Sequence, residues 1–402
     1  MNSSGLKLIE EDYIEATLGY IHPDLAKQIR AFTKEGGPLD NNIPNLSKKL
    51  NRKVFLKCIL EEIYKTPILK NARRDGLDLF HPRIVTRHAK KATKTTKAVE
   101  EKSDSLTKTK IRNAYSSVKR SFEELEKIFN ENWNIHDSKY LLTNEIVFAS
   151  AYIRHVKPKA SDPFDGKQRG KLSKWMFLSM INKPTTGGST LPMTEAACKV
   201  MRKPNPWTNL PNALKKNNIP LKPTLRVDHF GSHDRDEADS ILKENSTIFA
   251  LILCHNNLNK CTDVVDKTSL SGSNLNLDHF YAKKQMKKTK TKGHFDFLWD
   301  HAANKIWLNS GTNKWKNAKW PTEIKKGEIH TGSGHNTKKF DQTVKDNLTH
   351  QALPDKSVKV EKKHLFSGGK VVPKYIKFLE FRVKNLVKQL NKTLDHMDKN
   401  GF

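Results

Sequence analysis

Apolar residues recur every three to four positions through most of the chain, a spacing typical of helices with one buried face. The clearest case lies in residues 111–128, where the steps alternate between four and three: Ile111, Tyr115, Val118, Phe122, Leu125 and Ile128. This pattern predicts an amphipathic helix of about five turns. Fewer than three heptads fit, so bundle packing is favoured over a coiled coil.

Further helices are predicted on both sides of this segment. Residues 1 to about 85 have helical patterning, and so do residues 145–155 and 172–181. Thr194 is placed to cap the short helix that follows it. Pro373 is placed to begin a long helix, with apolar residues on one face and mostly Lys, Asn and Gln on the other.

Residues 275–308 depart from the helical spacing. Around residues 275–280, apolar and polar positions alternate, which predicts a short strand, and residues 305–308 form a second strand-like run. A turn-like Ser-Gly-Thr step at 310–312 can then start a helix. The sequence therefore predicts a β-hairpin followed by a helix within a mainly helical chain.

This region also carries polar residues whose spacing along the sequence is typical of a catalytic site. Asp278 and His279 end the first strand, and Asn304 precedes the second. Asn313 follows nine residues later, and Lys316 three residues after that. A carboxylate and an amide oxygen suit Mg²⁺ or Mn²⁺, and a neutral imidazole can accept a proton from water near pH 7. An Asn could hold the backbone around the histidine, and a Lys could bind phosphate. The set suits phosphodiester hydrolysis at one metal ion.

By these residues the region resembles the HNH (ββα-metal) nucleases. The resemblance implies that Asp278 and Asn313 are the ligands of one Mg²⁺ or Mn²⁺ ion. It also implies that His279 is the general base and Asn304 orients it, while Lys316 stands where the family often has a basic residue.

Two features depart from the family pattern. Many HNH proteins carry two Cys around the last Asn that bind a structural zinc, but Asn309 and Thr312 occupy those positions, so no zinc knuckle is expected. The segment after His279 also lacks the usual Pro. A chance origin of the motif is the alternative, because Asp228-His229 repeats the Asp-His step without the two Asn. That second copy is predicted to be a polar loop.

Over residues 111–402, and most strongly at 275–320, the chain resembles the C-terminal half of modification-dependent (type IV) restriction enzymes of the GmrSD kind. In these enzymes a ParB-like nucleotide-binding domain precedes the helical region and the HNH nuclease. The Asp-Gly-Gln-Gln-Arg signature of that domain and a Walker-type loop do not occur in the sequence. The resemblance thus implies a partner chain with the ParB-like domain, and no nucleotide bound by this chain.

The charge balance points to a polyanionic partner. The 402 residues carry 73 Lys and Arg against 43 Asp and Glu, a formal net charge of +30. Nucleic acid is the natural partner for such a charge, and the family resemblance implies duplex DNA, possibly modified or from phage. The candidate DNA-binding residues surround the hairpin: Lys283, Lys284, Lys287, Lys288 and Lys314. A solvated loop is the alternative for the lysine run. Four Trp between residues 299 and 320 are expected to serve packing rather than base stacking.

Other classes fit less well. The beginning of the sequence is acidic and resembles no signal peptide, and the apolar run at residues 248–254 is too short to cross a bilayer. The four widely spaced Cys indicate buried free thiols in a reducing cytoplasm. A cytoplasmic protein without membrane contact is therefore expected.

Together these observations predict a mainly α protein with a small α+β insert. The expected parts are an N-terminal helical region (1–87), a basic linker (88–110), a helical domain (111–265), an HNH nuclease domain (266–325) and a C-terminal helical region (326–402). The expected function is metal-dependent DNA cleavage in restriction or antiviral defence, with a homodimer if both strands are cut. A non-catalytic DNA-binding subunit and an RNA-cleaving HNH enzyme are the alternatives.

Overall fold

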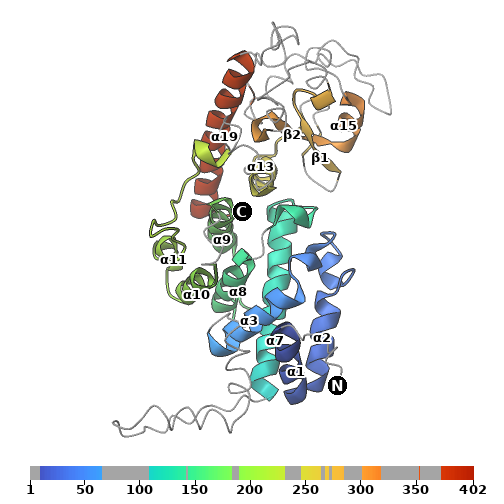
Figure 1. Cartoon of the computed structure of the whole chain (residues 1–402), viewed down its shortest axis with the longest axis vertical. Coiled ribbons are helices and arrows are strands. Elements are labelled where there is room, and N and C mark those ends of the chain that lie inside the picture. The colour runs from blue at the N-terminus through green and yellow to red at the C-terminus, as the bar shows by residue number, and fades with distance from the viewer. Residues whose placement is uncertain are drawn as a thin grey trace, which may run out of the picture. The chain divides into compact units, whose positions relative to one another are not determined.

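The computed structural model describes residues 10–65, 108–141, 144–182, 190–230, 246–263, 268–270, 274–284, 301–317, 353 and 373–402 (Figure 1). In these residues the protein is mainly helical with one small two-stranded antiparallel sheet, as predicted. None of the described helices combines the length and apolarity needed to cross a membrane.

The chain divides into two compact units whose segments interleave along the sequence. Unit 1 comprises Met1–Lys127, Leu142–Asp165 and Lys183–Leu221, and unit 2 comprises Ile128–Leu141, Gly166–Asn182 and Lys222–Phe402. The domain boundaries given above remain a prediction.

Unit 1 is built around helix α8 (Asn144–Val156), which packs against α3, α7 and α10. Every residue of α8 from 145 to 154 is buried, as expected for a helix surrounded by others. The other helices of this unit are α1 (Glu10–Ile21), α2 (Pro23–Thr33), α3 (Arg52–Tyr64), α7 (Lys108–Lys127), α10 (Thr190–Met201) and α11 (Leu210–Ala213).

The predicted amphipathic helix is confirmed as α7. Its apolar positions Ile111, Val118, Phe122 and Leu125 are fully buried. The chain then continues into a π-helical turn, Ile128–Asn132. The helices predicted over residues 145–155 and 172–181 are also confirmed, as α8 and as part of α9.

The predicted cap at Thr194 is wrong. Helix α10 begins at Thr190, so Thr194 is a buried residue inside the helix. In the sequence pattern Pro192 indicates a break between helices. Pro192 lies in the first turn of α10, where backbone N–H groups have no acceptor within the helix and proline is tolerated.

Unit 2 contains the sheet and its supporting helices. The elements are α9 (Gly166–Asn182), α13 (Ser246–Leu258), β1 (Leu275–His279), β2 (Lys305–Asn309), α15 (Ser310–Lys316) and α19 (Pro373–Lys399). Helix α19 begins at Pro373, as predicted, and packs against α9 and α13. At Gly170 a Cβ atom would collide with the carbonyl of Met397, so α9 and α19 meet there backbone to backbone.

The hairpin rests on aromatic side chains from three elements. Trp307 of β2 is 3% exposed, donates its Nε1–H to the carbonyl of Phe249 in α13 (3.2 Å), and meets the ring of Tyr140 edge-on. Tyr281 packs against Phe378 of α19. Trp307 therefore serves packing, as predicted. Trp299, Trp320 and the side chain of Trp315 lie outside the described residues.

The four cysteines are free and buried, as predicted. Burial raises the pKa of the Cys58 thiol and of the Cys261 thiol, each to about 11, so these groups are protonated at neutral pH. Protonated, enclosed thiols are poor nucleophiles, and none of the four is a candidate for chemistry.

Candidate functional site

The hairpin register places the predicted site residues at one end of the sheet. Leu275 pairs with Asn309 at one end, and His279 pairs with Lys305 at the other. Helix α15 follows β2 directly and packs on both strands (Figure 1). This hairpin and helix are the elements that the sequence predicted, in the predicted order.

Asp278 is held by a lysine from α15. The Lys316 Nζ atom lies 2.5 Å from Asp278 Oδ2, and the Lys316 side chain is 1% exposed against 22% for Asp278. Burial alone would raise the pKa of Asp278, but hydrogen bonding from His279 and the charge of Lys316 outweigh this and lower it to about 2. The carboxylate is therefore ionised at neutral pH.

Lys316 faces this carboxylate rather than solvent. Burial lowers the pKa of its ammonium group, and the charge of Asp278 offsets part of that effect. An ionised carboxylate 2.5 Å away favours the charged form of the amine, so we assign Lys316 as the ammonium form. In this structure Lys316 thus supplies the cation that neutralises Asp278.

His279 contacts a second lysine that the sequence did not single out. Lys305 Nζ lies 2.9 Å from His279 Nε2, and His279 Nδ1 lies 3.8 Å from Asp278 Oδ1. An ammonium group can only donate, so Nε2 accepts and the ring is neutral with its proton on Nδ1. The lone pair on Nε2 is the one that a general base needs. Lys305 could have been found only from the strand register, because it is 26 residues away in sequence.

Asn304 fixes the backbone just beyond the histidine. Its Oδ1 accepts the Tyr281 N–H at 2.9 Å, and its Nδ2 donates to the Tyr281 carbonyl at 3.1 Å. Its own carbonyl accepts the N–H of Phe280 at 2.6 Å. The side chain is fully buried, so each bond is shielded from water. The predicted contact between this Asn and the backbone around His279 is therefore present.

Arg382 of α19 supports the turn that carries Asn304. Its Nη1 donates to the Ala303 carbonyl at 2.5 Å, while its buried Nε has no hydrogen-bond partner in the part of the chain that the structure describes. Burial lowers the pKa of its guanidinium to about 9, although the nearby Tyr375 counteracts this. The sequence held a signal for this residue, because a charge stands at a core position of the apolar face formed by Leu379 and Leu386.

The remaining predicted residues differ in how much is described. Asn313 is half-buried on α15, one turn before Lys316 and therefore on the same helix face. Lys314 and Lys284 are exposed and Lys283 is half-buried. Lys287 and Lys288 lie outside the described residues, as do residues 88–107 of the predicted basic linker.

The donor set fits a magnesium-type ion better than a closed metal centre. Among the described residues, no three or more His, Cys, Asp and Glu side chains gather to hold a metal. Asp278 offers a carboxylate with about four acceptor sites, and Lys316 uses one of them. Asn313 offers an amide oxygen. Mg²⁺ and Mn²⁺ accept one or two protein oxygens and complete their shells with water and substrate phosphate.

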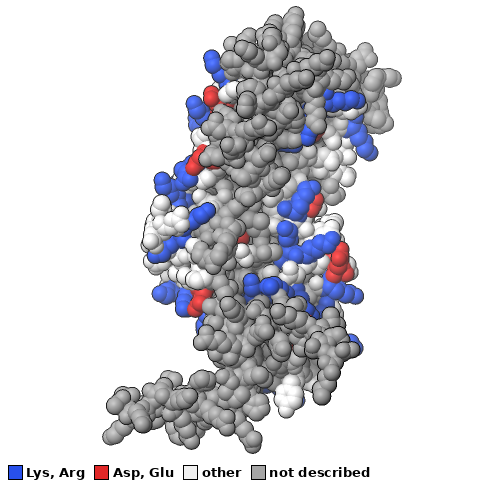
Figure 2. Space-filling model, viewed as in Figure 1, with Lys and Arg blue, Asp and Glu red and all other residues white. Residues whose placement is uncertain are grey.

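A second cationic surface, here called the lysine row, lies on α19. It consists of four exposed residues at helical spacing: Lys377, Lys384, Lys388 and Lys392. They share the face opposite the buried one and span about 22 Å along the axis. Glu380 and Asp395 flank the row. On the face seen in Figure 2, Lys and Arg cover more of the described surface than Asp and Glu do.

The second Asp-His pair has no site-like geometry. It forms a 3-10 turn, Val227–Phe230, in which Asp228 Oδ2 binds Nη2 of Arg226 at 2.7 Å. The side-chain hydrogen bond from Arg226, acting against partial burial, lowers the pKa of Asp228. This carboxylate is occupied by a local arginine, in keeping with the predicted polar loop.

Comparison with known proteins adds no assignment to this geometry. No protein-family model matches the chain, and no curated protein matches it either.

Proposed function

We propose that the protein is a metal-dependent endonuclease of the HNH type that hydrolyses phosphodiester bonds in DNA. One observation carries the proposal: Asp278 and His279 meet at the end of β1, with Asn304 fixing the backbone beside them and α15 supplying Lys316. An ionised carboxylate, a neutral imidazole and fixed backbone geometry are what this hydrolysis requires.

Asp278 and Asn313 would hold one Mg²⁺ or Mn²⁺ ion. When bound, the ion would neutralise charge on the scissile phosphate and stabilise the leaving oxygen. Lys316 keeps Asp278 ionised and in position, because its ammonium lies against Oδ2. Lys316 binds Oδ2, and His279 Nδ1 lies 3.8 Å from Oδ1. A carboxylate has about four acceptor sites, so Asp278 can still bind another cation.

His279 acts as the general base through Nε2. In the structure this lone pair accepts a hydrogen bond from Lys305. A phosphate oxygen is a stronger partner for an ammonium group than a neutral imidazole, since the bond is then between opposite charges. Substrate phosphate would thus draw Lys305 away and leave Nε2 to take the proton of an attacking water.

Asn304 and Arg382 are positioning residues in this proposal. Asn304 fixes the backbone after His279, and Arg382 fixes the turn that carries Asn304. Both side chains are buried, so their hydrogen bonds are shielded from water. The backbone that carries the imidazole is therefore held in place before substrate binds. Such preorganisation removes part of the entropy cost of the reaction.

DNA is the favoured substrate because of the charge distribution. The lysine row lies in the same unit as the hairpin and is long enough to follow about six base pairs. Lys283, Lys284 and Lys314 add cationic groups near the site. A role in restriction or antiviral defence, a ParB-like partner chain and a homodimer follow from the family resemblance alone.

The test is cleavage of plasmid DNA with Mg²⁺ or Mn²⁺ by the wild type, His279→Ala and Asn313→Ala. The matched control is His136→Ala, a half-buried histidine of unit 2 that belongs neither to the hairpin nor to α15. We expect metal-dependent cutting by the wild type and the control, and a loss of at least about 100-fold in His279→Ala. A single-stranded and duplex RNA arm distinguishes an RNA-cleaving enzyme.

Two results would count against the proposal. The first is cutting by both site variants at the wild-type rate, which would show that the hairpin is not the active site. The second is wild-type protein that binds DNA but neither cuts any substrate nor binds Mn²⁺, which would favour a non-catalytic DNA-binding subunit.

A further inference from the structure

Unit 1 contains an open cavity of about 690 Å³ that the proposed function does not use. Its walls come from the first half of α7, from the segment after α8 at residues 158–160, and from the end of α3. Cavities of this size hold small molecules the size of a nucleotide or a sugar phosphate. All residues that line it belong to unit 1, so the cavity does not depend on the hairpin.

The lining is cationic. Lys110, Arg120 and Lys159 contribute positive groups, and Glu62 is the only carboxylate among the described residues that line the cavity. Glu62 is already neutralised, since its Oε2 lies 3.1 Å from Arg154 and 2.9 Å from Arg202. The cavity therefore presents a net positive charge to a ligand.

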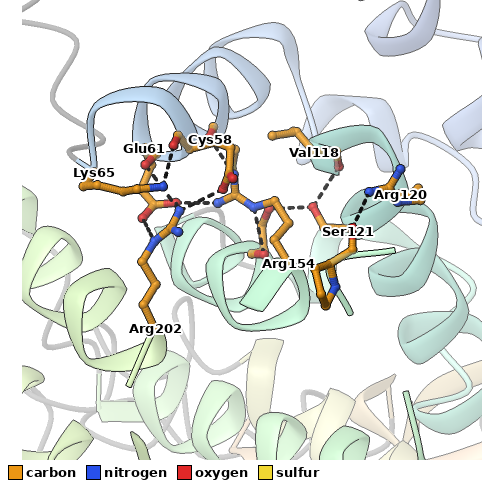
Figure 3. Close-up of polar contacts among 11 residues, drawn as sticks. Cys58, Glu61, Lys65, Val118, Arg120, Ser121, Arg154 and Arg202 are labelled. Atoms are coloured by element: carbon orange, nitrogen blue, oxygen red, sulfur yellow. Dashed lines mark hydrogen bonds and ion pairs between the residues drawn. The ribbon is translucent and has the colours of Figure 1, made fainter. Parts of the chain in front are cut away.

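Figure 3 shows how Arg154 and Arg120 differ in their surroundings. Arg154 of α8 points toward α3, and its guanidinium donates to Glu61 and to the carbonyls of Cys58 and Ser150. Arg120 donates from Nη2 to the Pro158 carbonyl at 2.9 Å, which ties the two walls together. Its Nε is buried and has no hydrogen-bond partner among the described residues. A buried donor without an acceptor is an unfavourable feature that a bound anion would relieve.

The same wall adds neutral donors. Asn113, Ser116 and Ser117 of α7 line the cavity beside Arg120. Asn113, Ser117 and Arg120 follow one another at steps of four and three, which places them on one helix face. Two arginine or lysine cations with hydroxyl and amide donors form the group that binds tetrahedral oxyanions in proteins.

We propose that this cavity binds a phosphate monoester, with Arg120 and Lys159 as its charged contacts. The small apolar residues Ile63, Ala114 and Ala160 line the rest of the cavity and would contact the body of the ligand. A concave site favours a terminal phosphate over the continuous backbone of a duplex, for which the lysine row is the more suitable shape. The phosphate belongs either to a free small molecule or to the 5′ end of a nucleic acid strand.

Calorimetry on the full chain at constant ionic strength tests this assignment. The probes are inorganic phosphate, AMP, and a short single-stranded DNA with and without a 5′-phosphate. Arg120→Gln and Lys159→Gln remove the proposed contacts. Arg112→Gln is the matched control, because Arg112 is an exposed arginine of the same helix that does not line the cavity. Lys159 is exposed, so its variant keeps the fold even if Arg120→Gln does not.

We expect AMP or the 5′-phosphorylated DNA to bind the wild type and Arg112→Gln alike, and to bind Arg120→Gln and Lys159→Gln about tenfold or more weakly. AMP binding alone identifies a free small molecule, and a difference between the two DNA probes identifies a strand end. Absence of binding by every probe overturns the proposal, and so does equal weakening in the Arg112 and Lys159 variants. Neither result bears on cleavage at the hairpin, which resides in the other unit.

Discussion

Two acidic groups, the buried Glu61 in unit 1 and the half-buried Asp278 in unit 2, are both paired with basic side chains but have different surroundings. Glu61 is 1% exposed, and its two oxygens receive Arg154 at 2.5 Å and Arg202 at 2.7 and 2.8 Å. Asp278 is 22% exposed, and it receives one close bond from Lys316, with His279 at 3.8 Å from its other oxygen.

The difference separates a structural charge from one available for chemistry. Both oxygens of Glu61 accept hydrogen bonds from the two arginines, so the cluster joins α3, α8 and Arg202, the residue directly after α10 (Figure 3). Asp278 keeps unused acceptor sites next to a neutral imidazole. Burial and ion pairing alone would rank both as functional, so unused acceptor capacity is the better indicator.

The largest effect on stability is expected at Glu61. Glu61→Gln removes the negative charge that balances Arg154 and Arg202. The NH2 group of the glutamine side chain would also replace one carboxylate oxygen, so that a donor would face the N–H groups of the arginines. We expect a loss of about 3 kcal/mol in the free energy of unfolding, measured by urea denaturation. Glu123→Gln, at an exposed i,i+4 pair with Lys119, should change it by less than about 0.5 kcal/mol. Equal effects in the two variants would show that the cluster is not structural.

A smaller loss of stability, joined to a loss of cleavage, is expected at Asn304. Asn304→Ala leaves the buried N–H and carbonyl of Tyr281 without their partners, which costs about 2 kcal/mol. Cleavage should fall as well, because the backbone beside His279 is released. The control is Asn259→Ala, because Asn259 is an exposed residue directly after α13 whose side chain also donates to a backbone carbonyl. Cleavage at the wild-type rate in a folded Asn304→Ala protein would remove its positioning role.

A substitution at Lys316 tests whether the Asp278 carboxylate has acceptor sites available for a metal ion. Because the ammonium occupies Oδ2, Lys316→Met should remove a competing cation and tighten Mn²⁺ binding by about fivefold, or about 1 kcal/mol. Titration calorimetry with Mn²⁺ gives the affinity directly. Weaker Mn²⁺ binding in a folded variant would mean that Lys316 orients the carboxylate more than it competes for it.

The smallest effect is expected with pH, at Glu62. Burial would raise the pKa of Glu62, but the charges of Arg154 and Arg202 outweigh it and lower the pKa from its ordinary value of 4.5. Because the folded-state pKa is below the unfolded one, the stabilisation is present above about pH 4.5 and is lost as the pH falls through the folded-state value. Glu62→Gln should therefore flatten the fall in stability on acidification, and an unchanged slope would exclude this contribution.

The sequence predicted the hairpin and its helix because their signals are local. Alternation in residues 275–280, the run at 305–308 and the spacing of Asn304, Asn313 and Lys316 can all be read without a structure. The contact between Asn304 and the backbone after His279 could also be predicted, since it follows from folding one strand back on the other.

Contacts between distant segments could not be predicted in the same way. The pair Arg202 and Glu61 is separated by 141 residues, and the pair Arg382 and Ala303 by 79. Lys305 reaches His279 only because of the strand register. The cavity of unit 1 joins three separate segments, and no motif in any one of them marks it.

The most direct test takes one variant from each region, His279→Ala and Glu61→Gln. For each variant both the DNA cleavage rate and the free energy of unfolding are measured. We predict that His279→Ala loses metal-dependent DNA cleavage by at least about 100-fold with unchanged stability. Glu61→Gln should lose stability while its folded fraction cleaves at the wild-type rate. DNA cleavage by His279→Ala at the wild-type rate would contradict the assignment of the hairpin as the active site.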